Sequence, residues 1–202
     1  MSHVLSWRHG WRIIITTTAL GLALALGFSL LLPMQYSSSM RLLITQMNTT
    51  GLDPYTAMKA TERIASSMSE LVYTSTFYQN VMTGAQGFNV NYFPLDEHGK
   101  RKLWQKTVET SVAPGTGIMT VTAYHPSRDQ ARILVEAASR ELASQATNYF
   151  GADIHVQVID APLDSQWLAR PNFISNAAFG LFVGLLIGIG WVLMSFSRRE
   201  LF

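Results

Sequence analysis

Two long runs of apolar residues lie near the two ends of the chain. No charged side chain occurs in residues 13–32 or in residues 173–196. At about 1.5 Å of rise per helical residue, each run is long enough to cross the roughly 30 Å of hydrocarbon in a bilayer. The pattern therefore predicts two transmembrane helices, with a segment of ordinary polarity between them.

The first apolar run also has a second interpretation, as a cleaved signal peptide, because basic residues precede it. Signal cores usually extend over about 7–15 residues and end in a small-x-small cleavage site. Here the apolar run is longer and continues into Leu31-Leu32-Pro33-Met34-Gln35. We therefore expect an uncleaved anchor.

In the first half of the intervening segment, apolar and polar residues first alternate and then follow a helical period. Apolar residues at every second position predict a strand over Tyr36–Ile44. Asp53-Pro54 is a helix start, with an N-cap and a proline at the first helical position, and apolar residues follow it at spacings of three and four. Shorter helices are expected over Phe77–Met82 and Lys100–Thr107, whereas Phe88–Gly99 between them has no clear period.

The second half of this segment contains a long helix and a final strand. Ser127-Arg128-Asp129-Gln130 has the form of a capping box, in which Ser reaches forward and Gln reaches back. The helix that it begins should continue to about Phe150 and end at Gly151. Alternating apolar residues predict a strand over 154–158, and a proline-containing linker over 160–172 follows it.

A predicted hairpin completes the order of elements. Val108–Val112 and Ile118–Tyr124 are strand-like runs that flank a short loop containing proline and glycine. The resulting order favours the α+β class, with a small split β-α-β (ferredoxin-like) antiparallel sheet that has helices on one face. Because the outer strands connect to spans that pack together, we expect them to be neighbours, with Leu42 and Val156 in one sheet.

The composition narrows the classes of function. Charged residues make up 14% of the chain, against roughly 25% in soluble domains, and the net charge is only +2 without a long basic run. Nucleic-acid binding therefore receives no support. The chain has no cysteine, which excludes a disulfide framework, a thiolate metal site and a lipoprotein anchor.

Arginines beside the apolar runs predict the orientation in a membrane. Arg8 and Arg12 precede the first run, and Arg198 and Arg199 follow the second. Since cations are retained on the cytoplasmic side, both termini are expected in the cytoplasm. The expected order is a cytoplasmic N-terminus (1–12), a span (13–32), an extracytoplasmic domain (33–172), a second span (173–196) and a cytoplasmic tail (197–202).

The sequence has no motif that supports catalysis. It contains neither a P-loop nor a G-x-S-x-G element, and its five histidines lack metal-ligand spacing. Asp160 and Asp164 are candidates for a paired-acid site, but turn-forming aspartates are the favoured interpretation. The basic cluster over Lys100–Lys106 is a candidate for binding acidic glycans or lipid phosphates, and a solvated helix face is favoured. We therefore expect no enzymatic activity, cofactor or metal.

Small residues repeat along both apolar runs. Gly180, Gly184 and Gly188 lie four residues apart and share one face of the second predicted helix. In lipid, such spacing allows backbones to approach closely, and helix association depends on that approach. Ala19, Ala23 and Gly27 form a comparable face on the first helix. The packing of these faces is predicted either within one chain or between chains.

The whole arrangement resembles the chain-length determinant (Wzz-type) polysaccharide co-polymerases. Three segments carry the resemblance. The stretch from Asp160-Ala161-Pro162 to Arg170-Pro171-Asn172 is similar to the family's proline-rich segment before the last span. Ser127-Arg128-Asp129-Gln130-Ala131 resembles its helix start, and Gly180-Leu181-Phe182-Val183-Gly184-Leu185 resembles its glycine-rich span. The chain departs from larger members in its shorter outer domain and its thinner proline segment, and no fused tyrosine kinase domain is expected.

The resemblance implies a non-enzymatic scaffold in the bacterial inner membrane. Members of the family form homo-oligomeric rings and regulate the length of O-antigen, capsule or exopolysaccharide made by a Wzy-type polymerase. Some act with a separate cytoplasmic tyrosine kinase. The residues expected to matter are those of the pre-membrane segment (Pro162, Arg170 and Pro171) and of the glycine faces. The alternative interpretation is an extracytoplasmic sensor or a regulatory subunit of another envelope complex.

Overall fold

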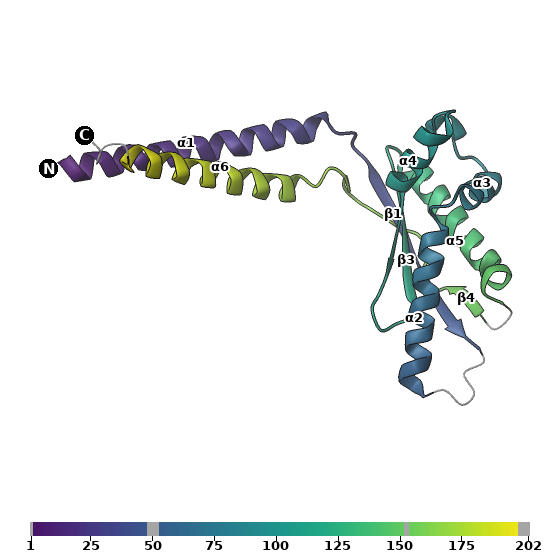
Figure 1. Cartoon of the computed structure of the whole chain (residues 1–202). Helices are drawn as coiled ribbons and strands as arrows, with labels where there is room; N and C mark the ends of the chain where they lie inside the picture. The colour runs from purple at the N-terminus through teal and green to yellow at the C-terminus, as the bar shows by residue number, and fades with distance from the viewer. Residues whose placement is uncertain (1, 48–52, 152–153, 198–202) are drawn as a thin grey trace. The chain divides into compact units, whose positions relative to one another are not determined.

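The computed structural model describes residues 2–47, 53–151 and 154–197, and it divides into two compact units. The helix-pair unit comprises the chain up to Met34 together with the chain from Arg170 onward, and the sheet unit comprises Gln35–Ala169. The chain is of the α+β class, with two apolar helices near its ends and a small antiparallel sheet between them in the sequence (Figure 1).

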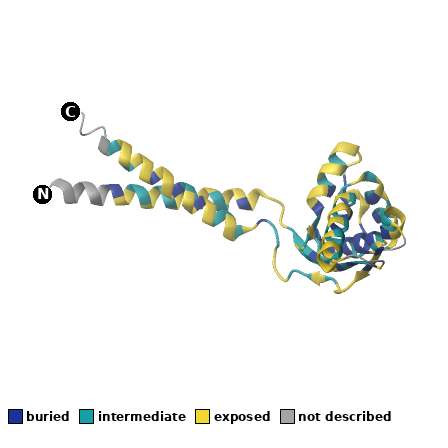
Figure 2. Cartoon of the chain, turned by 60° about the horizontal axis from the view of Figure 1, so that its bottom comes forward, coloured by how far each residue is buried: buried dark blue, intermediate teal, exposed yellow. Residues whose placement is uncertain are grey.

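The helix-pair unit consists of α1 (Ser2–Leu31) and α6 (Phe173–Ser197), which pack against each other. Within them, Gly10–Leu31 and Phe173–Ser195 are long and apolar enough to cross a membrane. Most of their side chains are exposed, as the yellow stretches of the two helices in Figure 2 show. A pair of helices that exposes so many large apolar side chains fits lipid better than water as its surroundings.

The sheet unit is built around one long central strand. β1 (Tyr36–Gln46) lies between β3 (Ile118–His125) and β4 (Ile154–Val158), and the full order is β2-β3-β1-β4 with β2 (Val108–Val112) at the edge. All of these pairings are antiparallel, and a two-residue strand, β5, also pairs with β1.

Helices cover one face of this sheet. Figure 1 shows α2 (Pro54–Leu71) and α5 (Arg128–Phe150) on the same side of the strands. Alternate residues of β1, namely Met40, Leu42 and Ile44, point into the core between the layers and are at most 7% exposed. The two shorter helices are α3 (Ser75–Gly84) and α4 (Glu97–Thr107).

Several sequence-based predictions are confirmed. The strand after the first apolar helix and the strand before the second are neighbours, so Leu42 and Val156 lie in one sheet on paired strands. The side chain of Asp53 accepts hydrogen bonds from the first-turn amides of α2, as an N-cap should. Gly151 ends α5 with a positive φ of 91°, a conformation that favours glycine.

The capping-box prediction for α5 is wrong. The side chain of Ser127 makes no cap hydrogen bond to the described part of the helix. Gln130 instead reaches away from the helix, because its amide group accepts from the backbone N–H of Asn89 at 2.8 Å and donates to the carbonyl of Gly87 at 3.1 Å. A long-range bridge to the preceding loop has therefore replaced the local reciprocal bond that the spacing suggested.

The segment Phe88–Gly99, which has no clear period in the sequence, contributes side chains to the core of the sheet unit. It holds a short 3₁₀ helix, η1 (Val90–Tyr92), and the buried rings of Phe88 and Phe93. Phe93 contacts Tyr78 edge-on at 5.2 Å between ring centroids, and Trp104 at 5.9 Å. Aromatic packing, rather than a helical or strand period, thus positions this segment. The helix that follows it, α4, begins three residues earlier than predicted.

Candidate functional site

The glycines of α6 form the close contact of the helix-pair unit. A Cβ atom at Gly184 would lie 2.6 Å from the carbonyl oxygen of Thr17, and one at Gly180 would lie 2.7 Å from the carbonyl oxygen of Gly21. A Cβ at Gly188 would lie 2.9 Å from Cα of Ile14. Because backbone atoms of α1 lie within 3.0 Å of all three positions, any larger residue would force the helices apart. The structure thus pairs this glycine face within one chain.

The face of α1 that meets these glycines differs from the expected one. Ala19 and Ala23 are exposed, and no described atom lies within 4 Å of a Cβ placed on Gly27. The contact uses the row that contains Thr17 and Gly21 instead. The two rows are offset by two residues, and two residues correspond to about 200° of rotation around a helix. The small-residue face that pairs with α6 within the chain is therefore nearly opposite the one with Ala19, Ala23 and Gly27, whose packing between chains stays a prediction.

Thr17 is compact enough for this contact because its polar group is satisfied within its own helix. Its hydroxyl donates to the carbonyls of Ile13 and Ile14, at 3.0 Å in each case. The hydroxyl hydrogen of Thr17 is thus used within α1, and its oxygen lies beside Gly188, where a larger residue would not fit. Threonine thus serves here as a small residue, together with glycine.

A polar pair joins the same two helices and was missed by the sequence analysis. Asn176 Nδ2 donates to Ser29 Oγ at 2.7 Å, and Ser29 Oγ donates to the carbonyl of Ala25 at 2.9 Å. Ser29 is only 1% exposed. Such interhelical bonds in membranes contribute about 0.6–2 kcal/mol each. The signal in the sequence was a single Asn at the start of an apolar run, which alone does not reveal its partner.

The linker before α6 is fastened to the sheet unit by a second polar arrangement, which we call the linker clamp (Ser37, Ser38, Arg132, Asp164 and Ser165). β5 (Leu163–Asp164) pairs with β1, so part of the predicted linker is a strand. Asp164 accepts from the buried hydroxyl of Ser38 at 2.7 Å and forms an ion pair with Arg132. Burial acts to raise the pKa of Asp164, but the hydrogen bonds from Arg132 and Ser38 prevail and lower it.

Backbone bonds extend the clamp along the linker. The N–H of Ser165 donates to the carbonyl of Ser37 at 2.7 Å, and the N–H of Ser37 donates to the hydroxyl of Ser165 at 2.9 Å. The N–H of Ala169 donates to the carbonyl of Gln35 at 2.8 Å. The first and last residues of the sheet unit are therefore hydrogen-bonded to each other, which a free linker would not achieve.

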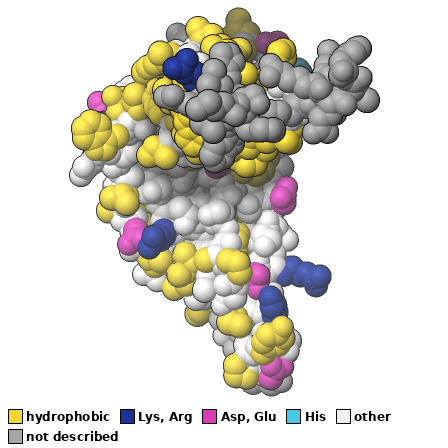
Figure 3. Space-filling view, turned by 90° about the vertical axis from the view of Figure 1, so that its left-hand side faces the viewer, with side chains coloured by type: hydrophobic (Ala, Val, Ile, Leu, Met, Phe, Trp, Pro, Cys, Tyr) yellow, Lys and Arg dark blue, Asp and Glu magenta, His cyan; other side chains and the backbone are white. Residues whose placement is uncertain are grey.

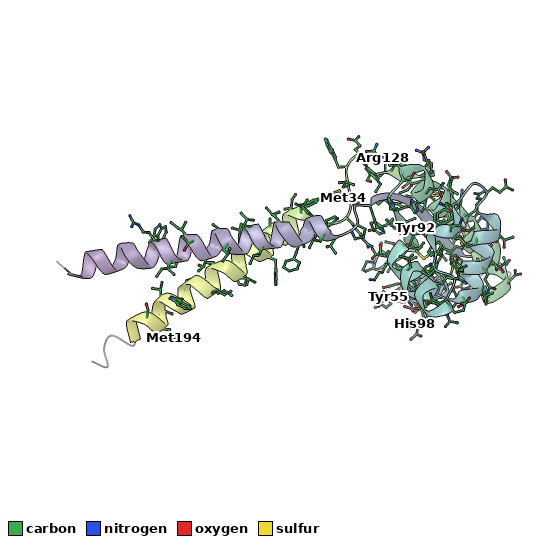
Figure 4. The ribbon with its side chains drawn as sticks, turned by 90° about the horizontal axis from the view of Figure 1, so that it is seen from above. Met34, Tyr55, Tyr92, His98, Arg128 and Met194 are labelled. Carbon is green, nitrogen blue, oxygen red and sulfur yellow. The ribbon has the colours of Figure 1, made fainter. Side chains whose placement is uncertain are left out.

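Arg128, labelled in Figure 4, holds the middle of the same segment. Its guanidinium donates to the carbonyl of Gln166 and lies over the ring of Tyr36, 4.5 Å from the ring centroid. Of the residues that the resemblance singled out, Pro162 is half-buried directly before β5, whereas Arg170 and Pro171 belong to the helix-pair unit.

The arginines that predict the orientation are only partly described. Arg12 is an exposed residue of α1. The backbone of Arg8 lies in the same helix. Arg198 and Arg199 lie outside the described residues, so the orientation itself stays a prediction.

The two candidate acids and the basic cluster on α4 have separate ion-pair partners. Asp160 lies 3.6 Å from Arg41, whereas Asp164 pairs with Arg132, so each acid of the candidate pair has its own arginine. Lys100 pairs with a glutamate one turn away on the surface of α4. Lysine and arginine side chains lie at several separate places on the face shown in Figure 3. Within the described ranges, no group of three or more His, Asp or Glu side chains is arranged to hold a metal.

His125 occupies an aromatic pocket at the end of β3. Its ring centroid lies 4.4 Å from that of Tyr92 and 5.7 Å from that of Phe88. Nδ1 accepts from the backbone N–H of Ser127 at 3.0 Å, which places the hydrogen of the neutral ring on Nε2. Nε2 is buried and has no hydrogen-bond partner among the described residues. Burial lowers the pKa of His125 because desolvation disfavours the imidazolium.

Comparison with protein-family models and with characterised proteins gives no match to this chain. Three features of the described residues bear on function: the close-packed apolar helix pair, the sheet unit whose two ends are bonded together, and the linker clamp.

The Gly184 contact predicts a specific loss of helix pairing. Gly184→Leu should separate α1 from α6 and cost about 1–2 kcal/mol, roughly a five- to thirtyfold change in the pairing equilibrium. Because the chain lacks cysteine, Ser29→Cys with Asn176→Cys provides a clean cross-linking pair, and free thiols are counted after oxidation. Leu185→Ile is the matched control. Equal cross-linking in the Gly184→Leu and Leu185→Ile proteins would contradict the prediction.

The His125 pocket predicts a pH-dependent stability. Below the unfolded pKa of about 6.5, the unfolded chain binds a proton that the folded pocket resists, so stability falls as the pH decreases. His125→Asn keeps an acceptor near Ser127 but cannot titrate. Its urea midpoint should therefore change less between about pH 7 and pH 5 than that of the unmodified protein. An equal change of the urea midpoint with pH in His125→Asn and in the unmodified protein would refute the assignment.

Proposed function

We propose that this protein is a two-span inner-membrane protein whose sheet unit lies outside the cytoplasm. Two helices of sufficient length and apolarity support the spans. The bias of arginines toward the outer ends of the sequence supports the orientation, with both termini in the cytoplasm. An aqueous surrounding for the sheet unit is supported by its buried core and by the polar side chains on the sheet face opposite the helices.

We propose further that the sheet unit is a split β-α-β, ferredoxin-like domain. Its strand order is the argument: β1 and β2 are separated by β3, and the hairpin of β2 and β3 inserts next to β1. The connecting helices lie on one face, as this arrangement requires. The fold places the first and last main strands side by side, which suits a domain inserted between two paired helices.

The function that these features support best is that of a non-enzymatic scaffold regulating the chain length or export of a surface polysaccharide. The single observation that carries it is the bonded closure of the sheet unit, in which the N–H of Ala169 donates to the carbonyl of Gln35. Such a closure holds the two ends of the domain together, and it requires no chemically reactive side chain. A homo-oligomer of such chains would present a rigid surface to a polymerase, as the resemblance to co-polymerases implies.

A sensor or regulatory subunit of another envelope complex is the second candidate. The observation that favours it is His125, whose buried Nε2 and lowered pKa make the sheet unit sensitive to acid. A sensor predicts that a His125 variant changes a response to pH, whereas a scaffold predicts an altered polymer length at constant pH.

The proposed orientation is tested by fusions. Alkaline phosphatase inserted after Gly115, in the loop between β2 and β3, should be active because that enzyme needs the oxidising outer compartment. The same enzyme fused after Phe202 should be inactive. The reverse pattern of activities would overturn the orientation.

The proposed role is tested by deleting the gene in a strain that makes a surface polysaccharide. The modal length or amount of the polymer should change on a gel, while the repeat unit is still made. Complementation with the Gly184→Leu gene should restore length less well than complementation with the Leu185→Ile gene, because only the former disturbs the helix pair. An unchanged polymer profile after deletion would contradict the role.

A further inference from the structure

A large apolar side chain stands out beside the bonded closure of the sheet unit. Trp167 is 83% exposed, and Leu168 next to it is 36% exposed. A freely moving linker could turn such side chains inward, but this one is held on both sides. The carbonyl of Gln166 accepts from Arg128, and the N–H of Ala169 donates to Gln35. The backbone on either side of Trp167 is therefore fixed while its indole stays exposed.

Chain connectivity limits how far this segment can lie from the apolar helices. Gln35 follows the end of α1 at Leu31 by four residues, which span at most about 14 Å. Trp167 precedes the start of α6 at Phe173 by six residues, or at most about 22 Å. The polar headgroup layer adds roughly 5–7 Å on each side of the hydrocarbon. Both limits therefore allow Trp167 to reach that layer when the helices span a bilayer.

We propose that residues 166–168 form an interfacial anchor, with Trp167 and Leu168 inserted into the headgroup region of the outer phospholipid surface. Indole is the side chain that prefers this region, since it has an apolar body and one N–H donor. Arg128 lies beside it, and a guanidinium has five donors, so N–H groups beyond those bonded to Gln166 can reach lipid phosphates.

This inference rests on the proposed membrane placement of α1 and α6, and it does not depend on the polysaccharide role. It adds a third contact with the membrane, made by the sheet unit itself. Because the same residues are fastened to β1 and α5, lipid contact at Trp167 would fix the orientation of the whole sheet unit above the membrane surface. The linker would then hold the sheet unit in one orientation, which a flexible linker could not do.

The absence of cysteine from the sequence allows a direct test by site-directed spin labelling of the full chain. Single cysteines replace Trp167, Leu168, His155 and Phe182, one at a time, and each labelled protein is reconstituted in phosphatidylcholine–phosphatidylglycerol vesicles. Leu168→Cys retains Trp167, so it reports on the intact anchor. His155 is an exposed residue of β4, paired with Thr45 and thus about 33 Å along β1 from Gln35. Phe182, an exposed residue of α6, serves as the lipid reference.

The readout is the accessibility of each label to oxygen, which concentrates in lipid, and to a water-soluble nickel chelate. Labels at 167 and 168 should show an oxygen-to-nickel ratio several-fold above that at 155 and below that at 182. A ratio at 167 and 168 equal to that at 155, with 182 in lipid, would overturn the anchor and leave the spans intact. Labels at 167 and 168 shielded from both reagents would also overturn it, because that result indicates a protein contact. A nickel-accessible label at 182 would overturn the membrane placement itself.

Discussion

The pairing of β1 on both of its sides is the constraint on which the sheet unit depends. β3 runs along one edge of β1, and β4 and β5 share the other edge. β1 follows shortly after the first apolar helix, and β5 and the residues after it lead to the second. The hydrogen bonds of one strand therefore determine where both connections leave the domain. The bonds from Ser165 to Ser37 and from Ala169 to Gln35 join backbone groups, so this closure does not depend on any single side chain.

Different physical interactions stabilise the two units. In the sheet unit, the burial of side chains such as Leu42, Met119 and Leu134 removes apolar surface from water, the dominant stabilising term in folding. That term is absent between helices in lipid, the surroundings proposed for α1 and α6, and the close contact of this pair is the backbone approach that Gly180 and Gly184 allow. Added side-chain volume would thus overpack the core of the sheet unit, whereas at Gly184 it would separate the helix backbones.

Local patterns in the sequence determined most of the elements, because helix caps and side-chain periods act over a few residues. Asp53-Pro54 specified the start of α2, Gly151 the end of α5, and alternation the strands β1 and β4. The order of elements even predicted that β1 and β4 are neighbours. The glycine face of α6 was visible in the same way, since three glycines four residues apart share one side of any helix.

Only the tertiary structure decided the features that depend on partners far along the chain. Gln130 bridges to the preceding loop instead of capping its own helix, and the buried Ser38 binds Asp164 of a two-residue strand that the linker forms along β1. On α1, two small-residue faces compete, and the rotation of the helices selects the one with Gly21 over the one with Ala23. A sequence pattern can show that one face of a helix consists of small residues. Which helix packs on that face depends on the packing of both helices along their whole length, and a short stretch of sequence does not contain that information.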